Sequence, residues 1–112
     1  MLIYKILRAN EWADLTRDGE TPGAPADLAD GYVHLSTAEQ LPETLRRHFA
    51  TGRGLMLLAL DAEAAAADLR WEPSRGGALF PHLYRPLRMA DVLWSRPIAD
   101  GPEGPLLPER IA

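Results

Sequence analysis

The sequence predicts a single α+β domain with a mixed or split β-sheet and two main helices. Its length of 112 residues favours one domain. Strand and helix patterns alternate in the first half, whereas the second half is rich in strands, and this order favours α+β over a doubly wound fold. Residues 1–98 are expected to form the core, and residues 99–112, rich in Pro and Gly, an irregular tail.

The first elements follow from short local signals. Residues 2–7, LIYKIL, form an apolar run of strand-forming residues. A helix is expected from Asn10, a good N-cap, through Asp18, with Gly19 ending it. Residues 20–31, ETPGAPADLADG, are predicted to form a loop because Pro and Gly interrupt both regular patterns. Such long loops in small domains are often functional.

The next strand and helix carry the first chemically interesting residues. Residues 32–35, YVHL, are predicted to form a short strand, and a helix is expected from Ser36 or Thr37 to about Ala50. A capping box is available from either start, from Ser36 to Glu39 or from Thr37 to Gln40.

The second half is predicted to be mainly strands. Residues 55–60, LMLLAL, are continuously apolar, which indicates a central strand covered on both faces. The other expected elements are a short helix after Asp61, strands at residues 69–72, 79–84 and 92–98, and a helical turn at residues 89–91. Pro81 predicts an edge strand or a bulge, because proline cannot donate a ladder hydrogen bond. The glycine-rich residues 73–77 favour a hairpin turn.

Composition excludes several kinds of site. The net charge is -4 and the pI about 5.3, so no nucleic-acid partner is expected, because such proteins usually carry a basic excess. The absence of cysteine excludes disulfides, thiol nucleophiles and thiolate metal sites. The three histidines form no H-x-x-x-H pair, and no metal site is expected.

The expected location is the cytoplasm. The opening MLIYKILRANEW lacks the basic start and long apolar stretch of a signal peptide. No apolar run is long enough to cross a membrane, so no membrane partner is expected.

His34 and Ser36 form the first candidate site. Alternate residues of a strand share a face, so these two side chains are predicted to point the same way. Ser36 also stands at a predicted helix N-terminus, where free N–H groups favour anions. A phosphate or a ribose fits this combination. The alternative is that Ser36 only caps the helix and His34 is a hydrogen-bonded core histidine.

His82 and Tyr84 repeat the same alternation. Two strands of the form His-x-hydroxyl suggest the two-histidine phosphoesterases, in which a general acid is paired with a general base. The alternative is a structural tyrosine whose hydroxyl is hydrogen-bonded.

Glu72 is the candidate acid. It follows Trp71 at the end of a predicted strand, where partial desolvation would raise its pKa and suit acid–base work. It could instead hold the two hydroxyls of a ribose, or bond Ser74 or the turn backbone. Glu72, His34 and Ser36 have the residue types of a Ser-His-acid triad, but no G-x-S-x-G elbow accompanies them.

Four arginines follow or precede these strands, and they could converge on a phosphate group. They are Arg70, Arg75, Arg85 and Arg88. The alternative is that most are solvated or paired, as surface arginines usually are.

The blocks DGYVHLSTAEQ, WEPSRGGALFPHLY and IYKIL-R-A-x-E-W closely resemble a bacterial family, the domain-of-unknown-function family 952. That family is similar in fold to the ADP-ribosyltransferases, whose two small sheets hold a nicotinamide dinucleotide between them. The resemblance implies that His34 and Ser36 bind the adenosine ribose, that Tyr84 stacks on nicotinamide and that Glu72 stabilises a ribosyl cation. Here Glu72 precedes Tyr84, whereas the usual order is histidine, tyrosine, glutamate.

The leading expectation is therefore a nucleotide-pocket protein related to the ADP-ribosyltransferases, with NAD or ADP-ribose as a ligand. The expected catalytic residues are Glu72 and His82, and the expected ligand-binding residues are His34, Ser36, Arg75 and Tyr84. Two other functions stay open. One is a non-enzymatic module that binds a small anionic ligand or a protein partner, and the other is a phosphoesterase that uses His34 and His82.

Overall fold

The computed structural model describes residues 1–108, apart from the side chain of Arg75. The strands are β1 (Leu2–Leu7), β2 (Glu20–Thr21), β3 (Val33–His34), β4 (Met56–Asp61), β5 (Leu69–Pro73), β6 (Leu79–Leu83), β7 (Leu87–Arg88), β8 (Val92–Pro97), β9 (Ala99–Gly101) and β10 (Gly104–Leu106). The helices are α1 (Ala9–Asp18), α2 (Pro25–Asp30) and α3 (Leu41–His48), with single 3-10 turns at Ala66–Asp68, Arg75–Gly77 and Met89–Asp91.

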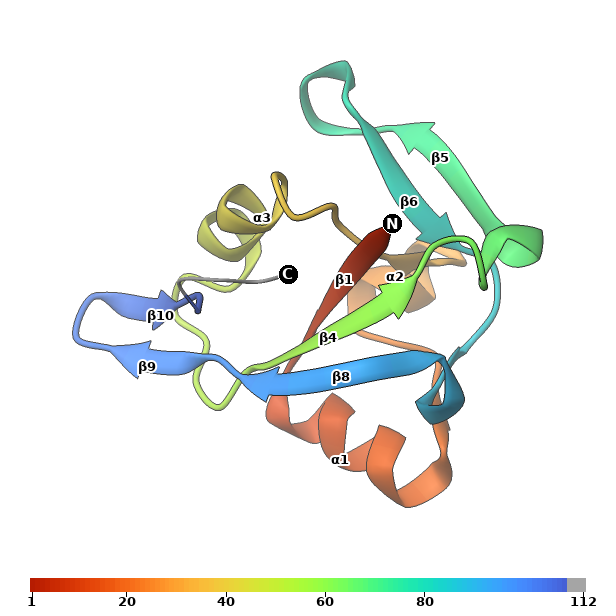
Figure 1. Cartoon of the computed structure of the whole chain (residues 1–112). Helices are drawn as coiled ribbons and strands as arrows, with labels where there is room; N and C mark the ends of the chain where they lie inside the picture. The colour runs from red at the N-terminus through yellow and green to blue at the C-terminus, as the bar shows by residue number, and fades with distance from the viewer. Residues whose placement is uncertain (109–112) are drawn as a thin grey trace.

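Two three-stranded sheets form the framework, in the orders β1-β4-β8 and β3-β6-β5 (Figure 1). The other strands form two two-stranded sheets, β2-β7 and β9-β10. Every ladder within residues 1–108 is antiparallel. A single bridge joins the two sheets, where the backbones of Tyr4 and Ser36 exchange hydrogen bonds of 2.8 and 2.9 Å. The α+β class is confirmed. The mixed form of the expected sheet is wrong, because every described ladder is antiparallel. The split form agrees with the two separate three-stranded sheets.

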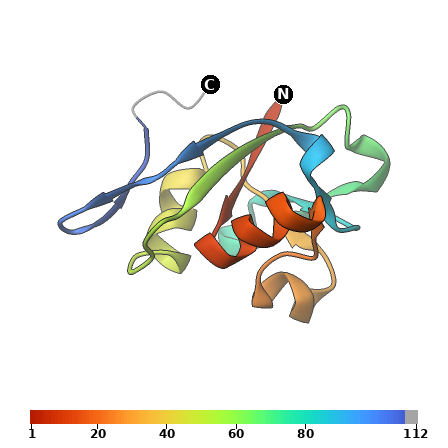
Figure 2. The same cartoon turned by 90° about the horizontal axis from the view of Figure 1, so that it is seen from below.

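The central strand was predicted from residues 55–60, and β4 confirms it. Its side chains alternate between two apolar clusters, with Leu58 and Leu60 in one and Leu57 and Ala59 in the other. The first cluster also contains Leu15 of α1 and the apolar side chains on one face of the β3-β6-β5 sheet. The second cluster contains Leu41 and Leu45 of α3. Figure 2 shows α1 and α2 on the same side of β4 and β8.

The expected loop at residues 20–31 contains a helix. Pro25 opens α2, where its missing N–H costs nothing, and Asp27 in the first turn accepts the N–H of Ala24 at 2.7 Å. Gly23 has a φ of 103°, and a Cβ there would collide with the Asp27 carboxylate. The Pro and Gly residues therefore bound a short helix rather than prevent one, and α2 adds to the two main helices that were expected.

The start of α3 also differs from the prediction. Ser36 stays extended in its bridge to Tyr4, a turn follows, and the helix begins only at Leu41. The capping box from Thr37 to Gln40 is present, since the Thr37 N–H donates to Gln40 Oε1 at 3.0 Å and the Gln40 N–H to Thr37 Oγ1 at 3.3 Å. α1 begins at Ala9 with Arg8 at its N-cap position, so Asn10 is not the cap, and Gly19 ends the helix as expected.

Two expectations about the second half are wrong. Pro81 lies in β6, the middle strand, and its carbonyl accepts the Leu35 N–H at 3.0 Å just beyond the end of β3, where the ladder needs no donor from proline. The tail is not irregular at residues 99–106, which form the β9-β10 hairpin with Gly104 at a φ of 125°. The last four residues of that tail, 109–112, lie outside the described residues.

Within residues 1–108, no helix has the length and apolar character needed to span a membrane. The cytoplasmic location stays a prediction.

Candidate functional site

One face of the β3-β6-β5 sheet carries three of the six predicted site residues. His34 pairs directly with His82 across β3 and β6, and Glu72 lies opposite Phe80 across β5 and β6. Because side chains alternate along each strand, His34, His82 and Glu72 project to the same side. The opposite face is apolar and belongs to the core, with Val33 and Leu83 fully buried.

Glu72 joins two of the predicted residues. Its Oε1 accepts a hydrogen bond of 2.8 Å from His82 Nδ1 and one of 2.5 Å from the Tyr84 hydroxyl. The hydrogen bonds from Tyr84 and His82 lower the pKa of Glu72, although slight desolvation opposes them. The expectation of a raised pKa is therefore wrong, because Trp71 does not cover the carboxylate and two donors point at it. The bond to Glu72 raises the pKa of Tyr84.

Tyr32, which sequence reasoning did not single out, packs against this group. Its ring stacks on His82 at a centroid distance of 4.2 Å and lies 4.7 Å from the His34 ring and 5.1 Å from the Tyr84 ring. The His34 and His82 centroids are 5.4 Å apart. The Arg70 guanidinium lies 5.0 Å over the Tyr84 ring. The Tyr84 ring therefore already has two neighbours, Tyr32 and Arg70.

His34 is held by two carboxylates of α2. Its Nδ1 lies 2.6 Å from Asp27 Oδ1, and its Nε2 lies 2.9 Å from Asp30 Oδ2. Carboxylates accept and do not donate, so both ring nitrogens of His34 face hydrogen-bond acceptors. His82 differs, because only its Nδ1 faces a carboxylate among the described contacts and the ring is 3% exposed.

Asp27 is also the partner of a buried lysine. Lys5 lies mid-strand in β1, and its Nζ donates to Asp27 Oδ2 at 2.8 Å and to the His34 carbonyl at 3.0 Å. Both side chains are almost inaccessible to solvent. Burial alone would raise the pKa of Asp27, but hydrogen bonds from His34 and the charge of Lys5 outweigh it and hold the pKa at about 2. This ion pair fixes α2 against β1 and the start of β3.

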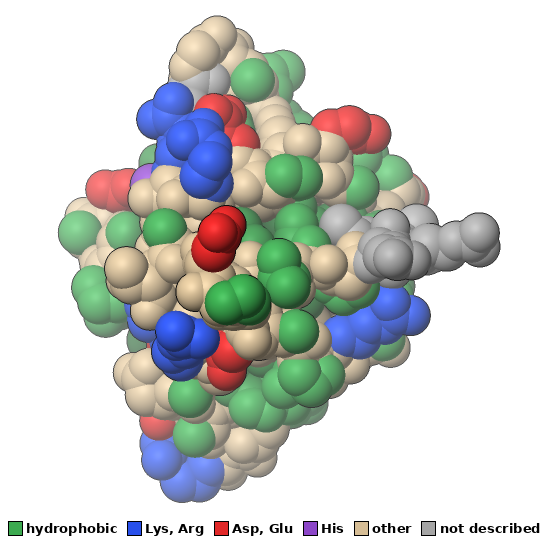
Figure 3. All heavy atoms as spheres, turned by 90° about the vertical axis from the view of Figure 1, so that its left-hand side faces the viewer, with side chains coloured by type: hydrophobic (Ala, Val, Ile, Leu, Met, Phe, Trp, Pro, Cys, Tyr) green, Lys and Arg blue, Asp and Glu red, His purple; other side chains and the backbone are tan. Residues whose placement is uncertain are grey.

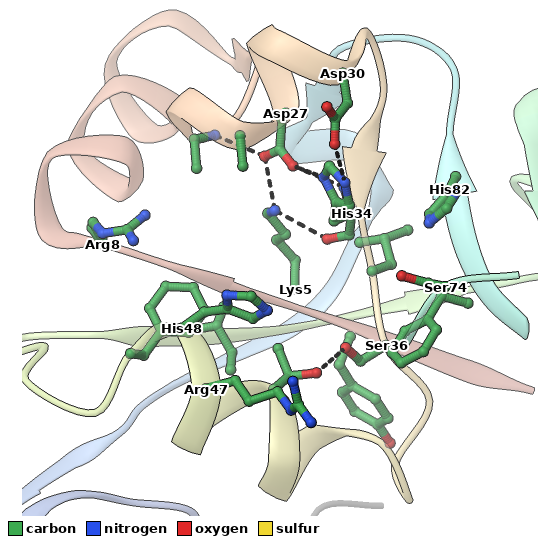
Figure 4. Close-up of a pocket in the computed structure, with 18 residues that line it drawn as sticks. Lys5, Arg8, Asp27, Asp30, His34, Ser36, Arg47, His48, Ser74 and His82 are labelled. Carbon is green, nitrogen blue, oxygen red and sulfur yellow. Dashed lines mark hydrogen bonds and ion pairs between the residues drawn. The ribbon is translucent and has the colours of Figure 1, made fainter. Parts of the chain in front are cut away.

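A cavity of about 450 Å³ opens beside these residues (Figure 4). His34, Ser36 and His82 form one part of its wall, and Arg8, Arg47 and His48 form another. The close-up shows His34 and Asp30 above, His82 and Ser74 to the right, and Arg8, His48 and Arg47 to the left and below. Glu72 and Tyr84 do not line the cavity, and they reach it only through His82.

Ser36 lines the cavity but not in the expected way. Its N–H donates to the Tyr4 carbonyl at 2.9 Å, and its Oγ lies 3.0 Å from Thr44 Oγ1. The helix N-terminus predicted at this residue is absent, because the bridge between the sheets uses the backbone groups. Ser36 therefore offers a hydroxyl rather than a free N–H to the cavity.

Two of the four arginines that were expected to converge on a phosphate group have other partners. Arg85 is paired with Asp68 and Asp91, its guanidinium at 2.9 and 2.8 Å from their oxygens. Arg70 lies over Tyr84. Arg75 falls in the turn, and its side chain lies outside the described residues, so its role in ligand binding stays a prediction.

The comparisons place the chain in a family. The model of DUF952, described as a protein of unknown function, matches residues 6–95. The chain belongs to the DUF952 family. It is 46% identical to protein CC0527 of Caulobacter crescentus, whose crystal structure superposes with a TM-score of 0.89 over 94% of this chain and 93% of that one. The solution NMR structure of CC0527 gives a TM-score of 0.81 over 93% and 90%. No curated protein matches the chain.

Charged side chains of both signs are mixed on one face of this DUF952 domain. Figure 3 views the side that carries α3 and the β9-β10 hairpin, and its basic side chains form separate groups with acidic and hydrophobic ones between them. Within residues 1–108, no group of three or more His, Asp or Glu side chains is placed to hold a metal ion.

The ionised Asp27 makes the stability of the DUF952 domain sensitive to acid. Its pKa is about 2 in the folded protein against 3.8 in the unfolded chain. This stabilisation is present above pH 4 and is lost as the pH falls through 2. We expect a loss of about 2 kcal/mol across that range. Urea unfolding at several pH values measures it.

The matched control for the acid experiment is the double variant Lys5→Met with Asp27→Leu, which keeps the bulk and removes both charges. Its unfolding free energy should fall by about 2 kcal/mol less than that of the wild type between pH 4 and pH 2. Parallel pH curves for the two proteins would contradict the assigned role of Asp27.

Proposed function

We propose that the cavity of about 450 Å³ binds a nucleotide or another phosphorylated ribose, with NAD and ADP-ribose as the leading ligands. The observation that carries this proposal is the pair of cross-strand histidines, His34 and His82, in the wall of one cavity. Pockets for small ligands usually have volumes of roughly 300–1,000 Å³. Apolar groups, among them Phe49 and Phe80, line the rest of the wall and suit a base or a sugar face.

The resemblance of the family to the ADP-ribosyltransferases supports the same ligand class. In this proposal His34 and the Ser36 hydroxyl hold a ribose, as the resemblance implies. Glu72 does not line the cavity, but its negative charge lies against His82, so in this proposal it would act on a developing ribosyl cation through that ring. We assign Tyr84 to the support of Glu72 rather than to stacking, because Arg70 and Tyr32 already contact its ring.

A specific observation favours a second candidate, the phosphoesterase. Each histidine has a carboxylate at its Nδ1, at 2.6 Å for His34 and 2.8 Å for His82. His34 is placed to donate from both nitrogens, whereas Glu72 leaves the Nε2 of His82 able to accept a proton. An acid and a base at neighbouring positions are what hydrolysis of a phosphate ester requires.

We expect NAD, ADP-ribose or AMP to bind the wild type and to raise its melting temperature. At a free ligand concentration 100 times the Kd, the stabilisation is about 2.7 kcal/mol. Isothermal calorimetry and thermal unfolding measure both quantities. His34→Ala should weaken binding, whereas Arg17→Ala, an exposed change on α1, should not. The absence of heat and of any thermal shift with all three ligands would remove the proposal.

Cleavage assays separate the remaining functions. Binding without turnover of NAD, ADP-ribose or a phosphodiester indicates a binding module. Cleavage that disappears in both His34→Ala and His82→Ala but survives in Glu72→Gln favours the phosphoesterase. Cleavage of NAD that disappears in Glu72→Gln, with the fold intact by circular dichroism, favours ADP-ribosyl transfer.

A further inference from the structure

The cavity has a second charged end that the sequence did not indicate. Arg8 stands between β1 and α1, and Arg47 lies in the last turn of α3, so two separate elements bring a guanidinium to the same wall. In Figure 4 the two side chains lie on the side of the cavity away from His82, with His48 between them. The histidines and the arginines thus occupy different parts of one cavity.

Arg8 and Arg47 are cations in the cavity wall whose guanidinium N–H groups are not all used by the ion pairs described for them. Lys5 also lines the cavity, but its ammonium group is buried in an ion pair with Asp27. Among the described residues, Arg8 and Arg47 each make one ion pair, at 3.4 Å with Glu11 and Glu43 respectively. That distance is long for a hydrogen bond, and a guanidinium has five N–H donors. Both side chains are nearly half exposed.

The surroundings restrict where the Arg8 guanidinium can lie. It lies 4.8 Å over the ring of Phe49, the residue that follows α3. This contact brings the start of α1 to the end of α3, the helix that carries Arg47. A planar guanidinium held on an aromatic ring still presents its N–H edge, which matches the oxygens of a phosphate.

We propose that Arg8 and Arg47 bind a phosphate group of the ligand, while the His34 and His82 end receives its sugar. This inference rests on the proposed function and deepens it, because it specifies a phosphorylated nucleoside rather than a free nucleoside or a free sugar. The ligand then spans the cavity, with its anionic group at the helical wall and its ribose at the sheet. The acidic side chains of the sheet end, Asp27 and Asp30, disfavour the reverse orientation.

Calorimetry with AMP, ribose 5-phosphate and adenosine tests this orientation. We expect the wild type to bind AMP at least tenfold more tightly than adenosine. Arg8→Ala and Arg47→Ala should each weaken AMP binding by about 10- to 100-fold, which is the usual size for a charge-assisted hydrogen bond, and should leave adenosine binding unchanged. The affinity of Arg47→Lys for AMP should lie between those of the wild type and Arg47→Ala, because lysine keeps the charge but lacks the planar guanidinium N–H groups.

Two arginines of the same helices provide matched controls. Arg46 adjoins Arg47 on α3 but does not line this cavity, and Arg17 is exposed on α1. Arg46→Ala and Arg17→Ala should change AMP binding by less than about twofold. Added salt offers a measurement that needs no variant, since it should weaken the binding of AMP and of ribose 5-phosphate but not that of adenosine.

The possible failures are distinguishable. If Arg8→Ala and Arg47→Ala bind AMP as well as the wild type does, the assignment of these arginines to the phosphate is wrong. The proposed nucleotide binding in the cavity is then unaffected. Equal, salt-independent affinities of the wild type for AMP and adenosine overturn the inference in the same way. If the wild type binds none of the three probes and gives no heat with NAD or ADP-ribose, the proposed function fails, and the inference fails with it. If it binds NAD or ADP-ribose but none of the three probes, the inference alone is overturned.

Discussion

Replacing Asp27 with Asn is expected to lower the free energy of unfolding by about 3–5 kcal/mol, the usual cost of removing one partner of a buried ion pair. The change leaves the Lys5 ammonium without a counter-charge in a site where its side chain is 6% exposed. It also weakens the contact with the His34 ring, which lies 2.6 Å from Asp27. Since a domain of this size is stable by roughly 5–15 kcal/mol, the variant should be close to unfolding at 37 °C. Urea unfolding at pH 7 measures the effect.

Two companion variants show whether the buried charge is the cause. The double variant Lys5→Met with Asp27→Leu should lose less than Asp27→Asn alone, because no unpaired charge remains. Asp14→Asn removes an exposed acid of α1 and should change the stability by less than about 0.5 kcal/mol. If Asp27→Asn proves as harmless as Asp14→Asn, the proposed role of the buried pair is wrong.

The second large effect is expected in the central strand. Leu58 is fully buried in β4, between Lys5 of β1 and Ser95 of β8 in the ladder. Leu58→Ala should cost about 2–5 kcal/mol, because it removes buried apolar surface and leaves a cavity. Leu93→Ala in β8, where the side chain is 58% exposed, is the control and should stay within about 0.5 kcal/mol. The urea midpoint should fall for Leu58→Ala while the slope stays constant. Equal losses in the two variants would show that β4 is not the core strand.

Local apolar patterns made the main strands predictable. Residues 2–7 and 55–60 are apolar runs too continuous for an exposed element, and they became β1 and β4. The partners of a strand are not encoded so locally. The bridge from Tyr4 to Ser36 joins residues from different sheets and fixes Ser36 as extended chain, which delays the start of α3. Helix propensity at residues 36–40 could not reveal that competing hydrogen bond.

Alternation along the strands could predict which candidate side chains lie together, but not what they are bonded to. Alternation along the strands predicted that His34 and Ser36 share a face, and the same rule placed His82 beside Tyr84. Lys5 was the overlooked signal, because a lysine in the middle of a buried strand needs an acid nearby. That requirement points to Asp27 or Asp30 in a segment that its Pro and Gly content had suggested was only a loop.

Tyr32 and the arginine end of the cavity had no comparable sequence signal. The contact of Tyr32 with His82 depends on how β3 pairs with β6, and Arg8 reaches the end of α3 only because its guanidinium lies over Phe49. These are consequences of tertiary packing. They matter for the proposed function because they bring two separate histidine motifs into the wall of one cavity that has a sheet end and a helical end.

The most direct test of the central claim is an NMR titration of the wild type with ADP-ribose, following backbone amides and the histidine ring signals. The predicted result is saturable shifts concentrated at residues 34–36, at His82 and at the end of α3, with Arg47 among the residues affected. Unchanged spectra at millimolar ADP-ribose, NAD and AMP, or shifts confined to the distant β9-β10 hairpin, would contradict the proposed cavity.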